Sequence, residues 1–256
     1  MSRLLALLYG TLCYAVFLAT FLYAVGFVAG LGVPKHVDNG APGDFVIVLT
    51  IDLALLGLFA VQHSGMARPG FKRWWTTIVP KPIERSTYVL FSSLALIALF
   101  WFWRPLAPML WDVEQPAARL ALYGLSALGW LLVLSGTFLI NHFDLFGLQQ
   151  VWQFSRGTSD AGEQPFMTRA FYRIVRHPLM LGFLIAFWAA PRMSVGHLLF
   201  ALMTTGYILV AVKFLEERDL IAIYGDTYRD YQRRVPMLLP LPKRPARTSG
   251  SPQHTS

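Results

Sequence analysis

Charged residues make up only 14% of this chain, and several of them flank one apolar stretch near its C-terminal end. Arg176, His177 and Pro178 precede the stretch, and Glu216 and Glu217 follow it. A carboxylate pair can accept hydrogen bonds from an ammonium group or a diol, and an arginine can bind a carboxylate through two parallel hydrogen bonds. These residue types predict a binding site for a small zwitterionic ligand.

A second group of polar residues lies at the ends of two other apolar stretches. His63 ends one stretch, Asn141 and His142 end another, and Arg85 lies in the basic segment between them. Histidine can act as a general base near neutral pH, and arginine or asparagine can orient or stabilise an anion. Each residue also has a structural interpretation, since histidines at helix ends are often solvated and asparagine can end a helix.

The composition indicates the elements that must position these groups. The chain has 256 residues, 55% of them hydrophobic, and a mean hydropathy of +0.48, which is typical of an integral membrane protein. Apolar runs cover residues 4–31, 45–61, 88–103, 120–140, 178–190 and 197–215. The fifth run is shorter than the roughly 20 residues that cross a bilayer. We expect an all-α integral membrane protein with five to six transmembrane helices, the fifth short and forming a helical hairpin with the sixth.

Basic residues predict the orientation of these helices. Most of the 22 lysines and arginines lie after the second, fourth and sixth apolar runs, so both termini are expected in the cytoplasm. The net charge of +8 is then explained by attraction to anionic lipid headgroups, and it does not indicate binding to nucleic acid. Cys13 is the only cysteine, which excludes disulfides within the chain, cysteine-ligated zinc and iron–sulfur clusters.

Residues 1–240 are expected to form one transmembrane domain, with the ligand-binding portion at about 172–240 and a disordered tail at 241–256. The polar segment 143–171 is a candidate lid. If the fifth and sixth helices were straight, Glu216 and Glu217 would project about 10 Å beyond the base of the fifth helix. A polar ligand could then lie between these glutamates and the Arg176–His177 pair.

The order and spacing of the C-terminal motif resemble a known family. Arg176-His177-Pro178-Leu179-Met180-Leu181-Gly182, followed by Glu216-Glu217, Leu220, Gly225, Tyr228, Tyr231 and Pro236, is similar to the isoprenylcysteine carboxyl and phospholipid methyltransferase superfamily. The resemblance implies that S-adenosylmethionine binds at Arg176, His177, Pro178, Gly182, Glu216, Glu217 and Tyr228. Met180 departs from the pattern, because many members have tyrosine there.

Other stretches resemble the bacterial methanethiol S-methyltransferases of that superfamily, including Gln62-His63-Ser64-Gly65-Met66-Ala67-Arg68, Glu84-Arg85-Ser86 and Asn141-His142-Phe143-Asp144. The resemblance implies an enzyme of the bacterial inner membrane that converts methanethiol to dimethyl sulfide. In-line methyl transfer would need a thiolate. His63 and His142 are the candidate bases, and Asn141 and Arg85 are the candidate orienting or thiolate-stabilising groups.

Three alternatives stay open from the residues alone. The methyl acceptor could be an isoprenylcysteine carboxylate or a phospholipid headgroup. The protein could instead bind a metal or haem through His63, His142 and His177, although these histidines lack paired spacing on one helix. A transporter could use Asp52, an intramembrane carboxylate, in a proton path. The chain has no P-loop and no dinucleotide-binding glycine motif, which argues against ATP and NAD.

Overall fold

The computed structural model describes residues 1–41, 43–158 and 170–241, and these residues are mainly α-helical. Within them, five helices are long and apolar enough to cross a membrane. They are α1 (Arg3–Ala29), α2 (Phe45–Met66), α4 (Lys81–Phe102), α5 (Pro116–Ile140) and a last helix, Val195–Tyr224. The shorter α8 (Pro178–Trp188) precedes the last helix and packs against it. The predicted fold class is confirmed.

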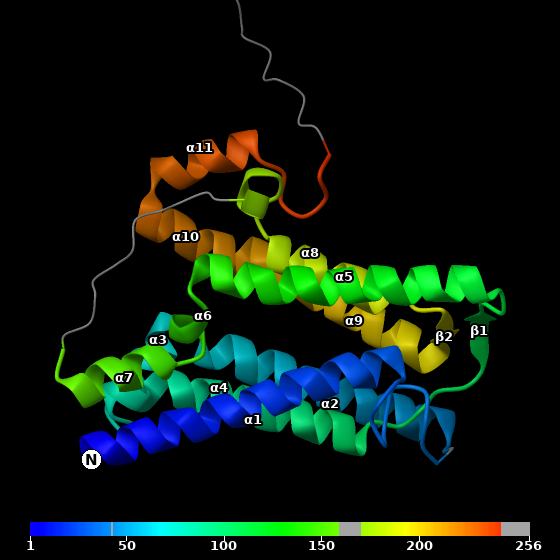
Figure 1. Ribbon diagram of the computed structural model, residues 1–256, viewed down its shortest axis with the longest axis horizontal. Helices are drawn as coiled ribbons and strands as arrows, with labels where there is room; N and C mark the ends of the chain where they lie inside the picture. The colour runs from blue at the N-terminus through cyan, green and yellow to red at the C-terminus, as the bar shows by residue number, and fades with distance from the viewer. Residues whose placement is uncertain (42, 159–169, 242–256) are drawn as a thin grey trace, which may run out of the picture.

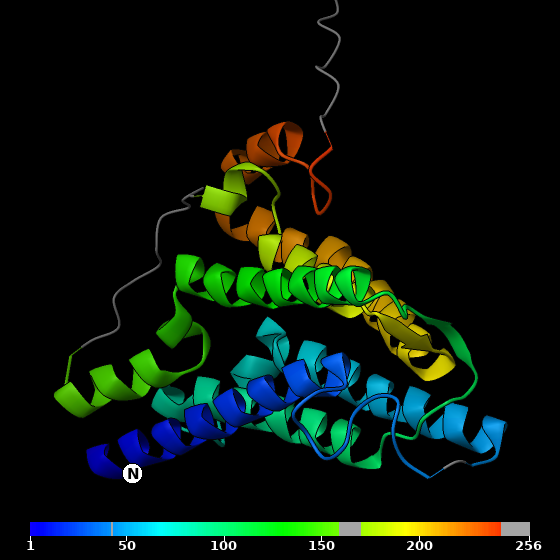
Figure 2. The same ribbon diagram turned by 45° about the vertical axis from the view of Figure 1, so that its right-hand side comes forward.

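The long helices form two layers. Helices α1, α2 and α4 make one layer, and α5, α8 and α9 (Val195–Ala211) make the other (Figures 1 and 2). All of them run roughly along one direction, so the bundle has two ends. At one end of the bundle α1 begins and α2 and α5 end. We call this end the basic end. It also carries α3 (Pro69–Trp75), α6 (His142–Leu145), α7 (Leu148–Arg156), η1 (Ala170–Arg173), α10 (Glu217–Tyr224) and α11 (Asp226–Arg234).

Polar caps fix where several helices begin. The Ser2 side chain accepts a hydrogen bond from the Leu5 amide, and the Asp44 side chain accepts from the amides of Val46 and Ile47. Ser194 does the same for the His197 amide at the start of α9. Helix α4 begins at Lys81, well before the apolar run, because the prolines at positions 80 and 82 suit a first helical turn.

The interior of the bundle is largely aromatic and aliphatic. Phe27 of α1, Trp103 after α4 and Phe200 of α9 are buried in one cluster that joins the two layers. Helices α5 and α8 pack most closely where two glycines meet. A Cβ added at Gly182 would lie 2.7 Å from the backbone oxygen of Gly129, so neither position has room for a side chain.

A two-stranded antiparallel sheet closes the other end of the bundle, and the sequence analysis did not anticipate it. Strand β1 (Met109–Asp112) pairs with β2 (Arg192–Ser194), which connects the short α8 to α9. The Asp112 carboxylate lies 2.6 Å from Arg119 Nη2 and 3.2 Å from Arg192 Nε. The sheet and these ion pairs join the connection before α5 to the turn of the α8–α9 hairpin.

Asp52 is fully buried in α2 and has a structural partner. Its Oδ1 accepts a hydrogen bond from the backbone amide of Arg104, 3.0 Å away, just after α4. The contact ties α2 to the end of the neighbouring helix. This arrangement favours a structural role for Asp52 over the proton path considered above.

Two of the predicted segments fall partly or wholly outside the described residues. Positions 143–158 of the candidate lid include most of α6 and all of α7. Positions 159–169 of the lid lie outside the described residues. Positions 242–256 of the predicted tail also lie outside them. The single-domain assignment therefore stays a prediction.

Candidate active site

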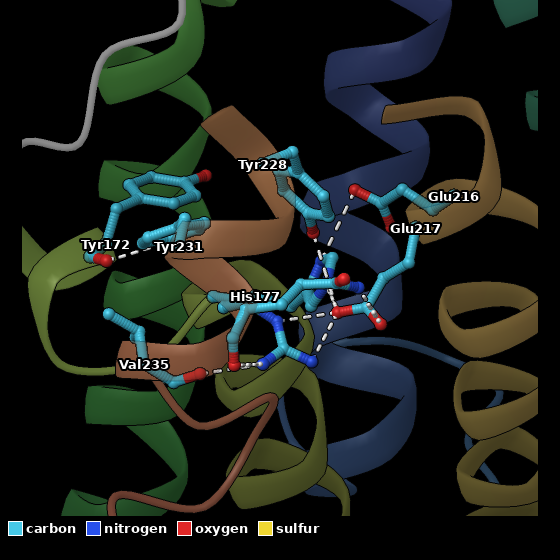
Figure 3. A network of polar contacts seen from close by, with 9 residues as sticks. Tyr172, His177, Glu216, Glu217, Tyr228, Tyr231 and Val235 are labelled. Carbon is cyan, nitrogen blue, oxygen red and sulfur yellow. Dashed lines mark hydrogen bonds and ion pairs between the residues drawn. The ribbon is translucent and has the colours of Figure 1, made fainter. Parts of the chain in front are cut away.

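Arg176 and Glu217 form the centre of a buried charge cluster at the basic end. Figure 3 labels Glu217 of this cluster together with His177, Glu216 and Tyr228. Arg176 Nε and Nη2 each lie 2.6 Å from Glu217 Oε1. Arg176 Nη1 donates to the backbone oxygens of Gln232 and Val235, at 3.1 and 2.7 Å. The guanidinium therefore joins the residues before α8, the start of α10 and the residues at the end of α11.

His177 adds a second positive charge to this cluster. Its Nε2 lies 3.2 Å from Glu217 Oε1, and its Nδ1 lies 3.4 Å from Glu216 Oε1. Burial alone would lower the pKa of His177, but the hydrogen bonds and negative charges of Glu216 and Glu217 raise this pKa to about 9. At neutral pH both ring nitrogens therefore donate, and two positive groups face two negative groups.

Helix α11 supplies the remaining contacts of Glu217. The Tyr228 hydroxyl donates to Glu217 Oε1 at 3.5 Å, and Gln232 Nε2 donates to Glu217 Oε2 at 3.0 Å. Both oxygens of the buried carboxylate are thus engaged by the protein. Glu216 differs, because its side chain is 45% exposed. It is the carboxylate of the pair that can meet a ligand.

The structure brings together five of the seven residues predicted to bind the cofactor: Arg176, His177, Glu216, Glu217 and Tyr228. The other two have packing positions. Pro178 is the first residue of α8, and Gly182 faces α5 at the contact with Gly129. Gln232 also belongs to the cluster and was missed, since a single glutamine in a charged helix carries no sequence signal.

The expected offset of about 10 Å between the two halves of this cluster is wrong. Arg176 and His177 contact the glutamates directly, because they precede α8 and their amides bond to the backbone oxygens of Pro236 and Met237. The last membrane-spanning helix is also not regular. It contains a π-helical turn, η2 (Val212–Glu216), immediately before Glu217. Such turns are frequent at functional sites.

A second cluster of predicted site residues lies between α2 and α4. His63 Nδ1 is 3.1 Å from Ser92 Oγ and 3.0 Å from the Tyr88 hydroxyl. The guanidinium of Arg85 lies over the Tyr88 ring, 5.7 Å from its centroid. The structure therefore brings the candidate base His63 and the candidate orienting group Arg85 together through Tyr88, which the sequence analysis did not single out.

His142 and Asn141 lie apart from that cluster, at the junction of α5 and α6. His142 Nε2 is 2.8 Å from the Tyr14 hydroxyl, and Nδ1 is 2.8 Å from Thr137 Oγ1. Its ring stacks on Phe138 at 4.2 Å, and burial lowers its pKa. Asn141 accepts from the Asp144 amide and donates to Gln149. These contacts hold the junction in shape.

Two side-chain contacts join the His63 cluster to the helix that carries the glutamates. Ser64 Oγ lies 2.9 Å from the Tyr207 hydroxyl of α9, and Arg68 Nη1 lies 3.0 Å from Asp219 Oδ2 of α10. Ser64 follows His63 directly, and Asp219 is two residues from Glu217. The charge cluster and the His63 cluster are therefore linked through neighbouring side chains at the basic end.

Metal ligation was the other chemistry considered for these histidines. Among residues 1–41, 43–158 and 170–241, no group of three or more histidine, cysteine, aspartate or glutamate side chains is arranged to hold a metal ion. His63, His142 and His177 each bond to different protein groups. This geometry does not favour the metal or haem interpretation.

The fold and the site together define a helical membrane protein that spans the bilayer several times and carries a buried charge cluster next to an aromatic–histidine cluster at one end. The chain belongs to the NnrU protein family, whose model matches residues 53–215.

Several relatives are similar over nearly the whole chain. A methanethiol S-methyltransferase of Mycobacterium tuberculosis is 56% identical and aligns with 95% of this chain and 99% of its own. One from Crocosphaera subtropica is 52% identical, with 94% and 93% covered. Nurim of Xenopus laevis is 30% identical over 77% of this chain and 76% of its own. No solved structure gives a significant match.

Proposed function

We propose that this protein transfers a methyl group from S-adenosylmethionine to methanethiol, which yields dimethyl sulfide. The observation that carries the proposal is the near-complete alignment with relatives named methanethiol S-methyltransferase, which are 48–56% identical to this chain. The side chains also support it, because a half-exposed carboxylate beside buried charges suits a zwitterionic donor, and a histidine at the same end of the bundle can take the proton of a thiol.

The proposed orientation follows from charge. Arg3, Arg68 and Arg73 lie at the basic end, and the N-terminus lies there as well (Figure 1). Basic residues concentrate on the cytoplasmic side of membrane proteins. We therefore assign the basic end and both termini to the cytoplasm of a bacterial cell, where S-adenosylmethionine is available, with the helices in the inner membrane.

The residues at the charge cluster fit S-adenosylmethionine, with one change from the expected roles. Four of the five N–H groups of Arg176 already meet Glu217 or a backbone oxygen, so we assign Arg176 to holding Glu217 and α11 in place rather than to binding the cofactor carboxylate. Glu216 is half-exposed and can accept from the ammonium group or the ribose hydroxyls. Bound S-adenosylmethionine would supply an electrophilic methyl group, whose transfer to the thiolate sulfur leaves S-adenosylhomocysteine.

The methyl-acceptor half of the site is assigned to His63. A thiol with a pKa of about 8.5 or higher is only slightly ionised at neutral pH, so a base that takes its proton increases the thiolate fraction. The ring nitrogens of His142 lie 2.8 Å from two hydroxyls, closer than the hydroxyl contacts of 3.0–3.2 Å at His63, which favours a structural role for His142. Arg85 is held near His63 by Tyr88 and can stabilise the thiolate. Asn141 orients the α5–α6 junction.

The test uses purified protein in lipid nanodiscs. The protein is incubated with methanethiol and S-adenosylmethionine carrying a deuterated methyl group, and headspace gas is analysed by mass spectrometry. We expect dimethyl sulfide with one deuterated methyl group, and none without the cofactor. Parallel reactions with geranylgeranylcysteine and phosphatidylethanolamine test the other acceptors. Methylation of either, with no dimethyl sulfide formed, would replace the proposed substrate.

A further inference from the structure

The ring of His63 is contacted by two hydroxyl groups, both from α4. Ser92 Oγ lies 3.1 Å from Nδ1, and the Tyr88 hydroxyl lies 3.0 Å from Nδ1 and 3.2 Å from Nε2. The Tyr88 hydroxyl is also 3.3 Å from the backbone oxygen of His63. The ring stacks on Phe59, with centroids 5.2 Å apart. One neighbouring helix thus controls where the imidazole points.

The Tyr88 hydroxyl carries one proton and lies near three groups of His63 that can accept it: the two ring nitrogens and the backbone oxygen. The backbone oxygen can only accept, so one arrangement that satisfies every contact has Tyr88 donating to that oxygen. Its lone pairs are then available to the imidazole N–H. In that arrangement the ring proton lies on Nδ1, where Ser92 provides a second oxygen, and Nε2 keeps the lone pair that a base needs.

Tyr88 also contacts the second charged group of this cluster. Arg85 precedes it by less than one helical turn and lies over its ring at 5.7 Å, within the range of a cation–π contact. The Tyr88 side chain is 8% exposed and packs beside Met66 and Val89. A buried tyrosine with its hydroxyl engaged holds one orientation, so it can fix both neighbours at once.

We infer that Tyr88 is the positioning residue of the methyl-acceptor half: it sets the tautomer and the direction of the His63 ring and keeps Arg85 beside it. This inference rests on the proposed function, in which the thiol gives its proton to His63 Nε2. Tyr88 acts through His63 and contacts no reacting atom itself. Its effect is therefore confined to the ionisation of the thiol, and cofactor binding at the charge cluster is independent of it.

The test compares Tyr88→Phe with Tyr9→Phe. The Tyr9 hydroxyl lies 3.1 Å from Oγ1 of Thr87, the residue before Tyr88, so the control removes a similar contact to α4 without touching His63. At about pH 7 we expect Tyr88→Phe to lower kcat roughly tenfold or more, with an unchanged KM for S-adenosylmethionine. This deficit shrinks as the pH approaches about 9.5, because the thiol then ionises without a base. Tyr9→Phe keeps the wild-type pH profile.

Two results with Tyr88→Phe would overturn the inference while leaving the proposed function intact: a wild-type kcat at every pH, or a deficit that stays constant with pH and so reflects packing alone. Absence of dimethyl sulfide from the wild-type protein would instead overturn the proposed function. Thermal unfolding checks that each variant is folded. If Tyr88→Phe does not fold, Ser92→Ala removes the other Nδ1 contact. A smaller, pH-dependent deficit in that variant supports the inference, and a wild-type profile overturns it.

Discussion

Arg176 and Glu217 form a buried ion pair in which both Nε and Nη2 of the arginine lie 2.6 Å from one carboxylate oxygen. Both side chains are less than a tenth exposed. The pair connects the residue before the N-cap of α8 to the start of α10. It therefore stabilises both the site and the packing of the bundle. An ion pair at the protein surface, such as Arg68–Asp219, has much weaker consequences.

Removing one partner of the buried pair should be costly. Glu217→Ala leaves Arg176 buried and unpaired, and we expect the free energy of unfolding to fall by about 3–5 kcal/mol. The matched control, Asp219→Ala, breaks the half-exposed pair with Arg68 and should cost no more than about 1 kcal/mol. Denaturant unfolding in detergent compares the two variants. Equal losses would contradict the structural role given to Arg176.

The neighbouring glutamate should affect binding more than folding. Glu216→Gln removes the charge of a half-exposed carboxylate that faces His177, so we expect stability to fall by about 1 kcal/mol, less than for Glu217→Ala. Affinity for S-adenosylhomocysteine should fall about tenfold, because a charge-assisted hydrogen bond becomes a neutral one. Isothermal titration calorimetry measures this affinity. An unchanged dissociation constant would remove Glu216 from the cofactor site.

The charge on His177 should make stability depend on pH. Its pKa is raised to about 9 in the folded protein, so the protonated ring stabilises the fold fully below about pH 6.5, the ordinary pKa of histidine. This contribution is lost as the pH rises through about 9. The difference in Tm between the wild type and His177→Gln should therefore narrow from pH 6 to pH 10. A difference that is constant with pH would contradict the assignment.

The two candidate bases should separate experimentally. His63→Gln is expected to lower kcat at neutral pH by about a hundredfold while the protein stays folded. His142→Gln leaves the hydroxyl of the buried Thr137 and that of the half-buried Tyr14 poorly paired, so we expect it to cost about 1–3 kcal/mol of stability. Activity per folded molecule should be preserved in that variant. Headspace assays and unfolding measurements on the same preparations give both values, and the reverse pattern would make His142 the base.

Gly182 provides a test of helix packing within the family motif. A Cβ at this position would lie 2.7 Å from the Gly129 oxygen and 2.9 Å from Val133, so Gly182→Ala must separate α5 from α8. We expect it to lose about 1–3 kcal/mol of stability. Gly124→Ala on α5 has open space around its Cβ and should be neutral or slightly stabilising. Equal Tm values for the two variants would show that the close approach is not needed.

The apolar runs predicted the membrane-spanning helices well, because a helix that crosses a bilayer must be apolar along its length. Their boundaries were less accurate wherever a helix continues into polar sequence. Helix α4 extends back to Lys81, and the last helix continues through Glu217 to Tyr224. The β1–β2 pair was missed because three or four residues in each strand give no periodic signal.

The charge cluster was predictable from a motif, and its internal geometry was not. Arg176, His177 and the two glutamates were expected on two sides of one ligand, with the glutamates about 10 Å beyond the base of the fifth helix. That they bond to one another, and that Gln232 joins them, depends on how α11 folds back over α10. Tyr88 and Tyr207 were missed for a related reason: a single tyrosine in an apolar helix usually belongs to the core, and only the packing of α2 against α4 and α9 gives it a partner.

Two backbone oxygens accept hydrogen bonds from Arg176. They belong to Gln232 and Val235, which follow Arg176 by 56 and 59 residues in the chain. During synthesis the ribosome produces α8, the π-helical turn and both glutamates before these oxygens exist. The cluster is therefore completed only after the last membrane-spanning helix has been translated and α11 has folded back over α10 at the basic end. Before that step Arg176 can pair with Glu217 but not with these two oxygens, so α11 is the last element to engage the guanidinium.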